Sequence, residues 1–349
     1  MAYSSGTFTD QFDLLGKIKL LLEDNGYTID SYTYDSSSYS PTYSPETSAN
    51  AKRLHAHKNG VYVNFRSTKG ASIFPQNTNG GRYGIGFNLG TGYDPSKNWI
   101  SQTGAPIENA TGYGLAGFTW CNQAGSYKIF LFDSPFTLIV YLNFTSTFVS
   151  YIYLGEMSAK YGAWDGGKFF FSSNRVDDSD STKNSTGSSG YPLLYLFSYT
   201  TAEYSVNGAI NISTAGVVPS GGTWVTSGRA SSGTTSDTLF LPPNCGYWSL
   251  TSRTVTSCSG SFNTSYLQVL PSSIVSPILL FPAQVRMIRN ISLTNTSFLG
   301  ELSHVKITSV PVSLFEQVVT YAGQEYMLLP IYTVLGSSNS VLAVEYDGV

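Results

Sequence analysis

The chain has 349 residues and a net charge of -3, and only 12% of its residues are charged, about half of the ~25% in ordinary globular proteins. This charge gives no electrostatic attraction toward nucleic acid or an anionic membrane, so neither is an expected partner. The chain is instead rich in Gly, Tyr and Phe, with 34, 25 and 20 residues. A surface of hydroxyls, amides and tyrosines is typical of secreted β-proteins, adhesins and virus particles, because low charge reduces the desolvation cost of assembly.

The N-terminus and the cysteines indicate where the protein is made. The opening sequence MAYSSGTFTD has neither the basic segment nor the apolar core of a signal peptide, so we expect synthesis in the cytoplasm. The chain has three cysteines, and this odd number argues against a disulfide framework. We interpret Cys121, Cys245 and Cys258 as free buried thiols; a bond between Cys245 and Cys258 across a hairpin is the alternative.

Residues 9–25 are predicted to form one short N-terminal α-helix. Thr7 or Thr9 would cap its start, and Asn25-Gly26 would end it, because glycine tolerates the left-handed cap conformation. We expect its apolar stripe to cover a sheet of the same subunit, with packing against a neighbouring subunit as the alternative. The stripe follows helical spacing through Leu14, Ile18, Leu21 and Leu22.

Residues 31–50 are predicted to form a long loop or extended arm rich in Ser, Tyr, Thr and Pro. Disordered segments are usually depleted in aromatic residues, whereas tyrosine on an extended segment offers a large contact area at low entropic cost. We therefore expect the arm to be ordered by packing on a neighbouring subunit or another protein. Its candidate subunit-contact residues are Tyr32, Tyr34, Tyr39 and Tyr43.

Residues 53–66 carry the clearest hairpin pattern. Asn59-Gly60 is a type I′ turn signal between alternating residues. His55 and His57 share one face of the first strand, as metal ligands sometimes do, but His304 is the only other histidine and a metal site needs more ligands. We interpret the two histidines as part of the polar face of the strand.

Residues 136–171 form the longest apolar and aromatic run, and we expect the chain to be organised around it. Strands near 113–121 and 127–132 precede it. In its second half, even-numbered residues such as Ile152 and odd-numbered residues such as Tyr151 fall on opposite faces, which is a strand period. A weak break at 143–146 predicts two strands in a central hairpin. Polar residues interrupt the run, so it does not predict a membrane span.

Beyond this run the chain alternates polar loops and short strands. The loop at 174–190 contains an alternating series of oxygen side chains at 178–184 that is similar to a calcium loop. Lys183 stands where that loop requires glycine and Ser189 where it requires glutamate, so we interpret it as a solvated loop. Strands are predicted at 193–199, 204–212, 223–227 and 247–256, with apolar strands in 266–309 and at least three more in 310–349.

The pattern predicts a mainly β protein with an antiparallel β-sandwich or barrel-like architecture and one short N-terminal α-helix. We expect four segments along the chain. They are the helix and arm at 1–50, a first β-region with the central hairpin at 51–175, a second β-region or insertion at 176–262, and strands that complete the β core at 263–349.

Sequence motifs of known chemistry are absent. The glycines at 84–92 do not match the dinucleotide fingerprint, and the chain has no phosphate-binding loop, nucleophile elbow or zinc-protease motif. We therefore expect no enzymatic activity, no cofactor and no metal. A glycosidase-like pair of carboxylates far apart in sequence stays an alternative.

Four short landmarks follow one another along most of the chain. The first joins Gly6-Thr7 and Asp13-Leu14-Leu15 to Asn25-Gly26-Tyr27. The second joins Gly92-Tyr93-Asp94-Pro95 to Gln102-Thr103-Gly104-Ala105-Pro106. The third consists of Ser146-Thr147-Phe148 and the YIYLG sequence that ends at Gly155. The fourth is FLGEL at 298–302, followed by GQEYML at 323–328 and a closing strand near Glu345.

In this order the landmarks resemble those of a family of tailed-bacteriophage virion structural proteins. The family's Y-P-Y-P segment is replaced here by Tyr161-Gly162-Ala163-Trp164, and its W-V-x-G-F segment by residues 305–310. The resemblance carries no catalytic residues. It implies a multicopy, non-enzymatic component of the neck, collar or tail of a phage particle, including baseplate or fibre-attachment positions. Its partners would be copies of itself and other virion proteins, and it would be assembled in the host cytoplasm.

The alternative function is a receptor- or glycan-binding module of the virion. Tryptophan offers a flat face on which a sugar can stack. The glycan-stacking candidates lie in Gly/Ser-rich settings and are Trp164, Trp224 and Trp248. The competing interpretation is that these aromatic residues fill cores or subunit contacts.

Overall fold

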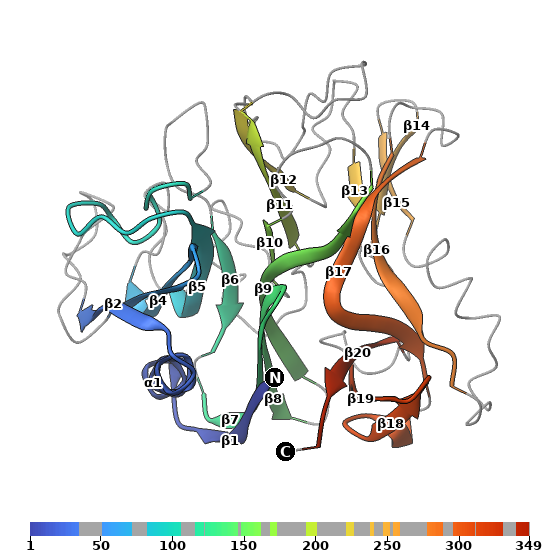
Figure 1. Ribbon diagram of the computed structural model, residues 1–349, viewed down its shortest axis with the longest axis horizontal. Coiled ribbons are helices and arrows are strands. Elements are labelled where there is room, and N and C mark those ends of the chain that lie inside the picture. The colour runs from blue at the N-terminus through green and yellow to red at the C-terminus, as the bar shows by residue number, and fades with distance from the viewer. Residues whose placement is uncertain are drawn as a thin grey trace.

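The computed structural model describes residues 1–34, 51–71, 82–105, 116–121, 123–145, 148–161, 168–172, 193–200, 221–226, 238–240, 247–251, 254–258, 278–288, 296–310, 312–330 and 340–348. In these ranges the fold is mainly β, with antiparallel pairing between the strands and one α-helix, as predicted. Figure 1 shows the small sheet and the helix together on one side of the molecule, and the large curled sheet on the other side. None of the helices described is long and apolar enough to cross a membrane.

The small sheet has five strands in the order β2-β3-β4-β5-β6. Helix α1 (Gln11–Asp24) packs on one of its faces (Figure 1). The Nε2 of Gln11 donates to the Thr68 carbonyl at 2.8 Å and ties the helix to β4. The strands are β2 (Thr28–Tyr34), β3 (Ala51–Lys58), β4 (Val61–Ala71), β5 (Arg82–Gly90) and β6 (Gly117–Trp120).

The large sheet has 13 strands, and its main path is β1-β7-β8-β9-β17-β20-β19-β18. Strands β10, β11 and β12 extend it from β9, and β16 and β13 from β17. The main-path strands are β1 (Ala2–Phe8), β7 (Gly125–Asp133), β8 (Phe136–Thr145), β9 (Phe148–Lys160), β17 (Thr296–Ser309), β18 (Val318–Tyr321), β19 (Gln324–Pro330) and β20 (Ser340–Tyr346). The branches are β10 (Lys168–Ser172), β11 (Leu193–Thr200), β12 (Gly221–Thr226), β13 (Thr238–Phe240) and β16 (Phe281–Ile288).

The predicted central hairpin is confirmed, and it separates the two main cores. Strands β8 and β9 pair in register from Thr137 opposite Gly155 to Asn143 opposite Val149. Tyr151 and Tyr153 face a core inside the curl of the large sheet, whereas Ile152 faces a core between the two sheets that also receives α1. The alternation predicted from sequence is therefore correct, and both faces of the hairpin are buried.

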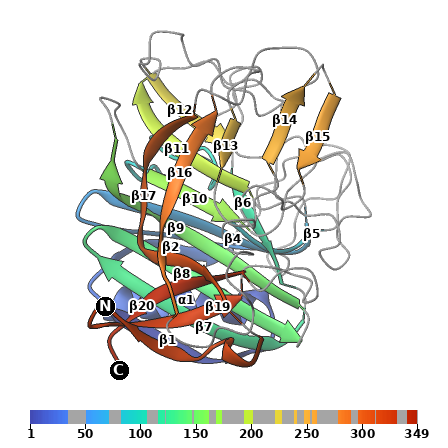
Figure 2. The same ribbon diagram turned by 90° about the vertical axis from the view of Figure 1, so that its right-hand side faces the viewer.

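The large sheet turns a corner between β9 and β17. In Figure 2, β16 and β17 run steeply across the direction of β7, β8 and β9. This corner brings the C-terminal strands back over the inner face of β7 and β8. The chain ends lie close together (Figure 1), with the N-terminal amine 3.8 Å from Asp347 Oδ2. A smaller third core, which includes Leu280 and Leu328, covers the outer face of these C-terminal strands.

The helix forms as predicted, but its N-cap is Asp10 rather than Thr7 or Thr9. Asp10 Oδ1 accepts the backbone N–H groups of Phe12 and Asp13, both at 2.9 Å. Thr7 is not available as a cap because it belongs to β1 and pairs with Ser126. The end of the helix at Asn25 and the burial of its apolar stripe against the protein's own small sheet are confirmed.

The hairpin between β3 and β4 has the predicted turn. Asn59 and Gly60 have φ values of 51° and 79°, and positive values at both central positions define type I′. The predicted arm at 31–50 is wrong for its first residues, because 31–34 belong to β2, which pairs with β3 of the same chain; residues 35–50 lie outside the described residues. The residues Thr28–Tyr34 show no clear alternation in burial, and the pairing with β3 has an irregularity between Ile29 and Ser31, so sequence period alone did not reveal this strand.

The later predictions have mixed outcomes. The strand predicted at 247–256 is instead a separate antiparallel pair of β14 (Tyr247–Thr251) and β15 (Thr254–Cys258), with Thr251 opposite Thr254. Three strands after residue 310 are confirmed. The strand predicted at 204–212 and the loop at 178–184 lie outside the described residues. Short helix η2 (Val312–Leu314) precedes β18.

Cys121 is a free, buried thiol, as predicted. Its burial raises the pKa of the thiol well above the ordinary value, with the charge of Asp10 as a smaller cause. Cys245 lies outside the described residues, and Cys258 is described only as a backbone position in β15.

Candidate functional site

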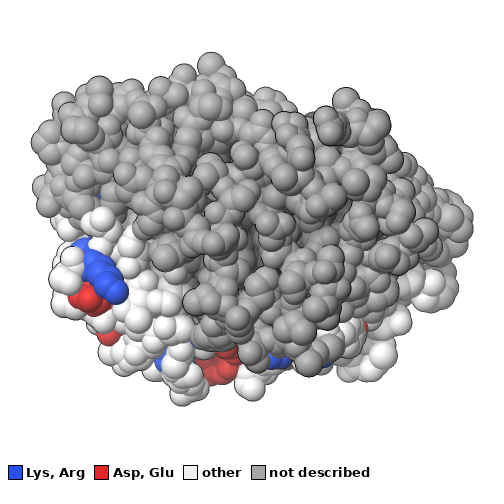
Figure 3. Space-filling view, turned by 90° about the horizontal axis from the view of Figure 1, so that it is seen from above, with Lys and Arg blue, Asp and Glu red and all other residues white. Residues whose placement is uncertain are grey.

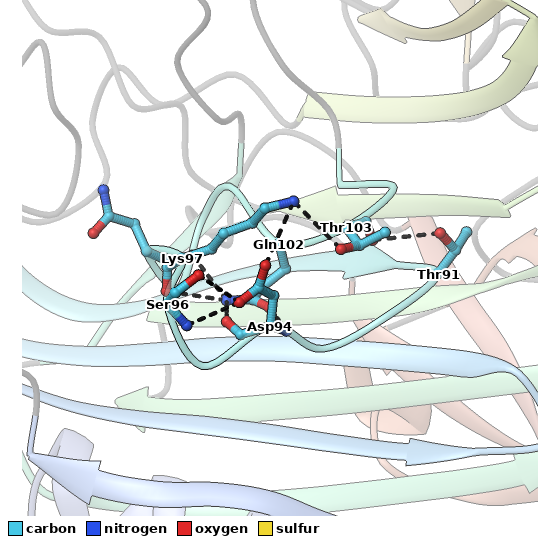
Figure 4. Close-up of polar contacts among 7 residues, drawn as sticks. Thr91, Asp94, Ser96, Lys97, Gln102 and Thr103 are labelled. Atoms are coloured by element: carbon cyan, nitrogen blue, oxygen red, sulfur yellow. Dashed lines mark hydrogen bonds and ion pairs between the residues drawn. The ribbon is translucent and has the colours of Figure 1, made fainter.

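The best-defined surface feature is the loop that follows β5, residues 91–105, hereafter the Gln102 loop. Figure 4 shows its polar contacts. The Gln102 side chain is 2% exposed and lies at the centre of the loop. Its Oε1 accepts the Asp94 N–H at 2.7 Å, and its Nε2 lies 3.1–3.2 Å from the carbonyls of Asp94, Lys97 and Asn98. One amide side chain therefore satisfies backbone groups from both halves of the loop.

The base of the loop and its tip are also fixed. The N–H of Thr91 donates to the Thr103 carbonyl at 2.7 Å. At the tip, Asp94 Oδ1 accepts the N–H and hydroxyl of Ser96 at 2.9 and 2.6 Å (Figure 4). Hydrogen bonds from Ser96, with a smaller contribution from the charge of Lys97, lower the pKa of Asp94. The tip is thus ordered while it stays open to solvent.

Beneath the loop, a row of polar side chains crosses the small sheet. His55 Nδ1 lies 2.7 Å from Asn64 Oδ1, and Asn64 Nδ2 donates to Asn88 Oδ1 at 2.9 Å. Asn88 Nδ2 then donates to the Ile100 carbonyl in the loop at 3.0 Å. This row connects β3, β4 and β5 to the Gln102 loop, and it orients the loop on the sheet.

His55 and His57 lie on β3, as predicted, but only His57 is partly exposed. His55 is 1% exposed because the Gln102 loop covers it, with the Tyr93 ring 5.1 Å from the imidazole. His57 is partly exposed on β3 between β2 and β4, 2.8 Å from Asp30 and stacked on Tyr62. Nowhere in the described ranges do three or more His, Cys, Asp or Glu residues gather as metal ligands would.

Chemically, the Gln102 loop presents a fixed set of donors and acceptors rather than a reactive pair. The surface residues are uncharged apart from Lys97 and Asp94, whose side chains lie 4.0 Å apart. A loop held this rigidly loses little entropy when it binds. It is suited to polar contact with another protein or a sugar. Its exposed polar residues are Thr91, Ser96, Lys97, Asn98 and Thr103.

A second polar cluster joins the C-terminal part of the large sheet to β7 and β8. Glu316, in the segment between η2 and β18, accepts from Tyr141 Oη and Asn143 Nδ2, both at 2.9 Å, and is hydrogen-bonded to Lys128. Burial raises the pKa of Glu316, but the bonds from Lys128, Tyr141 and Asn143 outweigh it and the pKa is lowered. The cluster pins the C-terminal strands to β7 and β8.

The structure places only some of the predicted site residues. Tyr32 is half-buried in its own subunit, with Lys52 Nζ 3.7 Å from the ring centroid, whereas Tyr34 is 58% exposed. Tyr32 is therefore held by its own sheet, because β2 is a strand and not part of the arm. Tyr39, Tyr43 and Trp164 lie outside the described residues.

The remaining two tryptophans are described only as backbone positions. Trp224 pairs with Phe197 in β11–β12 of the large sheet. Trp248 pairs with Ser257 in the separate β14–β15 hairpin. The backbone thus puts the two glycan-stacking candidates on different sheets.

The sequence landmarks occupy framework positions. The second landmark forms the Gln102 loop. Residues 151–155 of the third lie in β9 and residues 298–302 of the fourth in β17, and these two strands pair just beyond the third landmark, with Leu302 opposite Met157. Tyr153 Oη donates to the Ser303 carbonyl at 2.8 Å at this contact. The described residues of these landmarks therefore lie in a loop and in strands that build the framework of the fold.

No protein-family model matches the chain, and a comparison with curated proteins gives no match. The fold and the site define a class only: a mainly β, antiparallel protein with a curled sheet and a rigid polar loop. Sequence reasoning missed the Glu316 cluster, because its partners lie 173 to 188 positions away and no local pattern connects them.

Proposed function

We propose that this protein is a non-enzymatic structural component of a tailed-phage virion, in the neck, collar or tail, assembled in multiple copies. The observation that carries the proposal is the ordered series of landmarks. Their framework positions support it, since a resemblance that reflects a shared fold is expected at residues that build the fold. Its partners are other copies of itself and other virion proteins.

The low charge of the surface supports an assembly role. Figure 3 shows one face of the molecule, on whose described part basic and acidic side chains form small separate groups among uncharged residues. Such a surface can be covered by a neighbour with a small desolvation cost. Symmetric rings reuse one surface against the next copy.

The proposal is tested by mass spectrometry of purified particles. A stoichiometric component is expected, with a copy number that matches a symmetric ring or its multiples. Absence from particles that are otherwise complete would overturn the proposal.

The arm gives a sharper assembly test. A variant that lacks residues 35–50 keeps β2 and should fold, but it should incorporate poorly into particles. The matched control replaces Tyr39 and Tyr43 with Ser and keeps the length of the arm. If both variants are incorporated normally, the arm does not contribute to assembly.

The second candidate function is binding to a host receptor or glycan, and the Gln102 loop favours it. Its ordered hydroxyl, amide and ammonium groups match the hydrogen-bonding pattern of a sugar. Purified protein would be tested for binding to host cells and to their surface polysaccharide. The exposed Lys97→Ala and Asn98→Ala changes should each weaken such binding without changing the fold; unaltered binding would exclude the loop.

A further inference from the structure

Strand β17 changes its partner at Ser303 and His304. It pairs with β9 through Gly300–Leu302 and with β20 from Val305 onward. His304, between these two pairings, has a φ of 57°, a left-handed conformation that costs energy for a residue other than glycine. His304 therefore lies at the corner where β17 leaves β9 and begins to pair with β20.

The His304 side chain bridges two other elements at this corner. Nδ1 lies 2.7 Å from Glu345 Oε2 on β20, and Nε2 lies 3.1 Å from the Pro135 carbonyl oxygen in the β7–β8 turn. The ring stacks on Phe132 with a centroid separation of 4.0 Å and an interplanar angle of 5°. Its side chain is 15% exposed, so protons can still exchange with solvent.

Both partners of the ring are acceptors. A carbonyl oxygen cannot donate, and an ionised carboxylate only accepts. Two donated bonds therefore need both ring nitrogens to carry hydrogen, whereas neutral imidazole has one N–H. We propose that His304 is a proton-controlled clasp, which in its doubly protonated form joins β20 to the β7–β8 turn and which loosens when the ring loses a proton.

The charges around the ring are consistent with a cation. Glu345 is the carboxylate that contacts it. Asp133, next to the turn, is bonded to Lys58 at 2.7 Å, and Lys306 on β17 lies over the Tyr326 ring, 6.0 Å from its centroid. Tyr153 on β9 and Tyr326 on β19 are two further titratable groups near Glu345.

Those tyrosines stay neutral. Burial, and after it the charge of Glu345, raises the pKa of Tyr153 on β9 well above its ordinary value, and the same two causes raise the pKa of Tyr326 on β19. Neither side chain supplies a charge that could replace the imidazolium.

Loss of the proton leaves one ring nitrogen with a lone pair facing an oxygen, so one of the two bonds is lost. The clasp is therefore complete when both ring nitrogens carry hydrogen, and it weakens when one of them loses it as pH rises. The bond from Tyr153 to Ser303 and the Glu316 cluster remain, so the expected change is local opening of the corner and not unfolding.

The direct test is NMR of the imidazole nitrogens in the wild-type protein. The chain has three histidines, and the His304 resonances are assigned by their loss in His304→Phe. Below about pH 6, both His304 nitrogens should show protonated shifts and slowed proton exchange. A neutral His304 ring in the folded protein at that pH would overturn the proposal.

Hydrogen exchange tests the consequence. Phenylalanine keeps the stacking on Phe132 but makes neither bond, so β20 amides in His304→Phe should exchange about tenfold faster than in wild type at pH 5.5. This ratio should fall severalfold by pH 8.5. His57→Phe, which removes a histidine bonded to Asp30 within the small sheet, is the matched control and should show no effect at β20.

A second variant keeps the proposal testable if His304→Phe does not fold. Glu345→Gln presents an amide that can accept from a protonated ring or donate to a neutral one. In Glu345→Gln, the β20 amides should therefore be equally protected from hydrogen exchange at pH 5.5 and at pH 8.5. If the ratio of β20 amide exchange rates between wild type and Glu345→Gln does not change with pH, the clasp is contradicted.

Discussion

Gly300 is a residue whose role comes from the backbone opposite it. It lies in β17 where that strand meets β9, and a Cβ at this position would overlap the carbonyl oxygen of Ala159. A backbone oxygen in a paired strand cannot move aside as a flexible side chain can. Gly16 in α1 differs, because an added Cβ would meet only the Tyr32 hydroxyl at 3.3 Å.

These two glycines give a matched pair of substitutions. Gly300→Ala should destabilise the protein by about 1–3 kcal/mol, because the two strands must separate to admit the methyl group. Gly16→Ala should be neutral or stabilise by up to about 1 kcal/mol, because alanine is a better helix former. Denaturant unfolding measures both; equal effects would mean that β9 and β17 are not closely paired here.

Glu316 is a residue whose charge depends on pH in a way that bears on stability. Its pKa is lowered from the ordinary value of 4.5. For a carboxyl with a lowered folded-state pKa, the added stability is present above the unfolded-state pKa and is lost as pH falls through the folded-state pKa. The cluster should therefore be intact above about pH 4.5 and weaken below it.

The Glu316→Gln variant tests this dependence. Above about pH 4.5 it should be less stable than wild type, because glutamine accepts the Tyr141 and Asn143 bonds but does not neutralise Lys128. The difference in melting temperature should shrink steadily as pH falls to about 3. Glu325→Gln, an exposed carboxyl on β19, is the control; a Glu316 difference that is constant with pH would contradict the assignment.

At the scale of elements, the Gln102 loop shows how one buried side chain can organise a segment. The Nε2 group contacts three carbonyls, so its replacement by a carboxylate oxygen would bring like partial charges together. The size and shape of the side chain would not change. This makes glutamate a sharper probe than alanine.

Gln102→Glu should open the loop while the sheets stay folded. Each unsatisfied buried group costs about 1–3 kcal/mol, so proteolysis within 91–105 should accelerate at least about tenfold. Ser96→Ala removes one exposed bond in the same loop and should change the rate little. Protection of the Gln102→Glu loop at the wild-type level would show that Gln102 does not hold it.

At the scale of the whole molecule, the β8–β9 hairpin contributes to both main cores. Because each strand has a buried side chain on either face, loss of packing on one face strains the pairing that supports the other. We therefore expect the two sheets to unfold in one cooperative transition.

Ile152→Ala tests this coupling. It should cost about 2–5 kcal/mol, the usual range for truncation of a fully buried isoleucine. Hydrogen exchange should show the same loss of protection in β4 of the small sheet and in β17 of the large one. Val318→Ala, on a partly exposed strand, should have no such effect; loss confined to the small sheet would contradict a shared core.

The elements that sequence predicted best are those whose signals are local. The type I′ turn at Asn59-Gly60 and the two apolar faces of the β8–β9 hairpin follow from backbone preference and side-chain period within a few residues. The candidate site was only partly accessible. Gln102 was visible as part of a landmark, but its role as the centre of a loop was not, because its contacts are to backbone groups and leave no residue pattern.

The sequence by itself determined the class of the fold, the helix with its buried stripe and the central hairpin, since each depends on neighbouring residues. The tertiary structure alone decided that Asp10 caps the helix, because β1 already uses Thr7. It also decided that the Gln102 loop covers His55. Only the curl of the large sheet brings His304 to the Pro135 carbonyl and Glu316 to Lys128, because these contacts form between segments distant in sequence and depend on the path of the backbone between them.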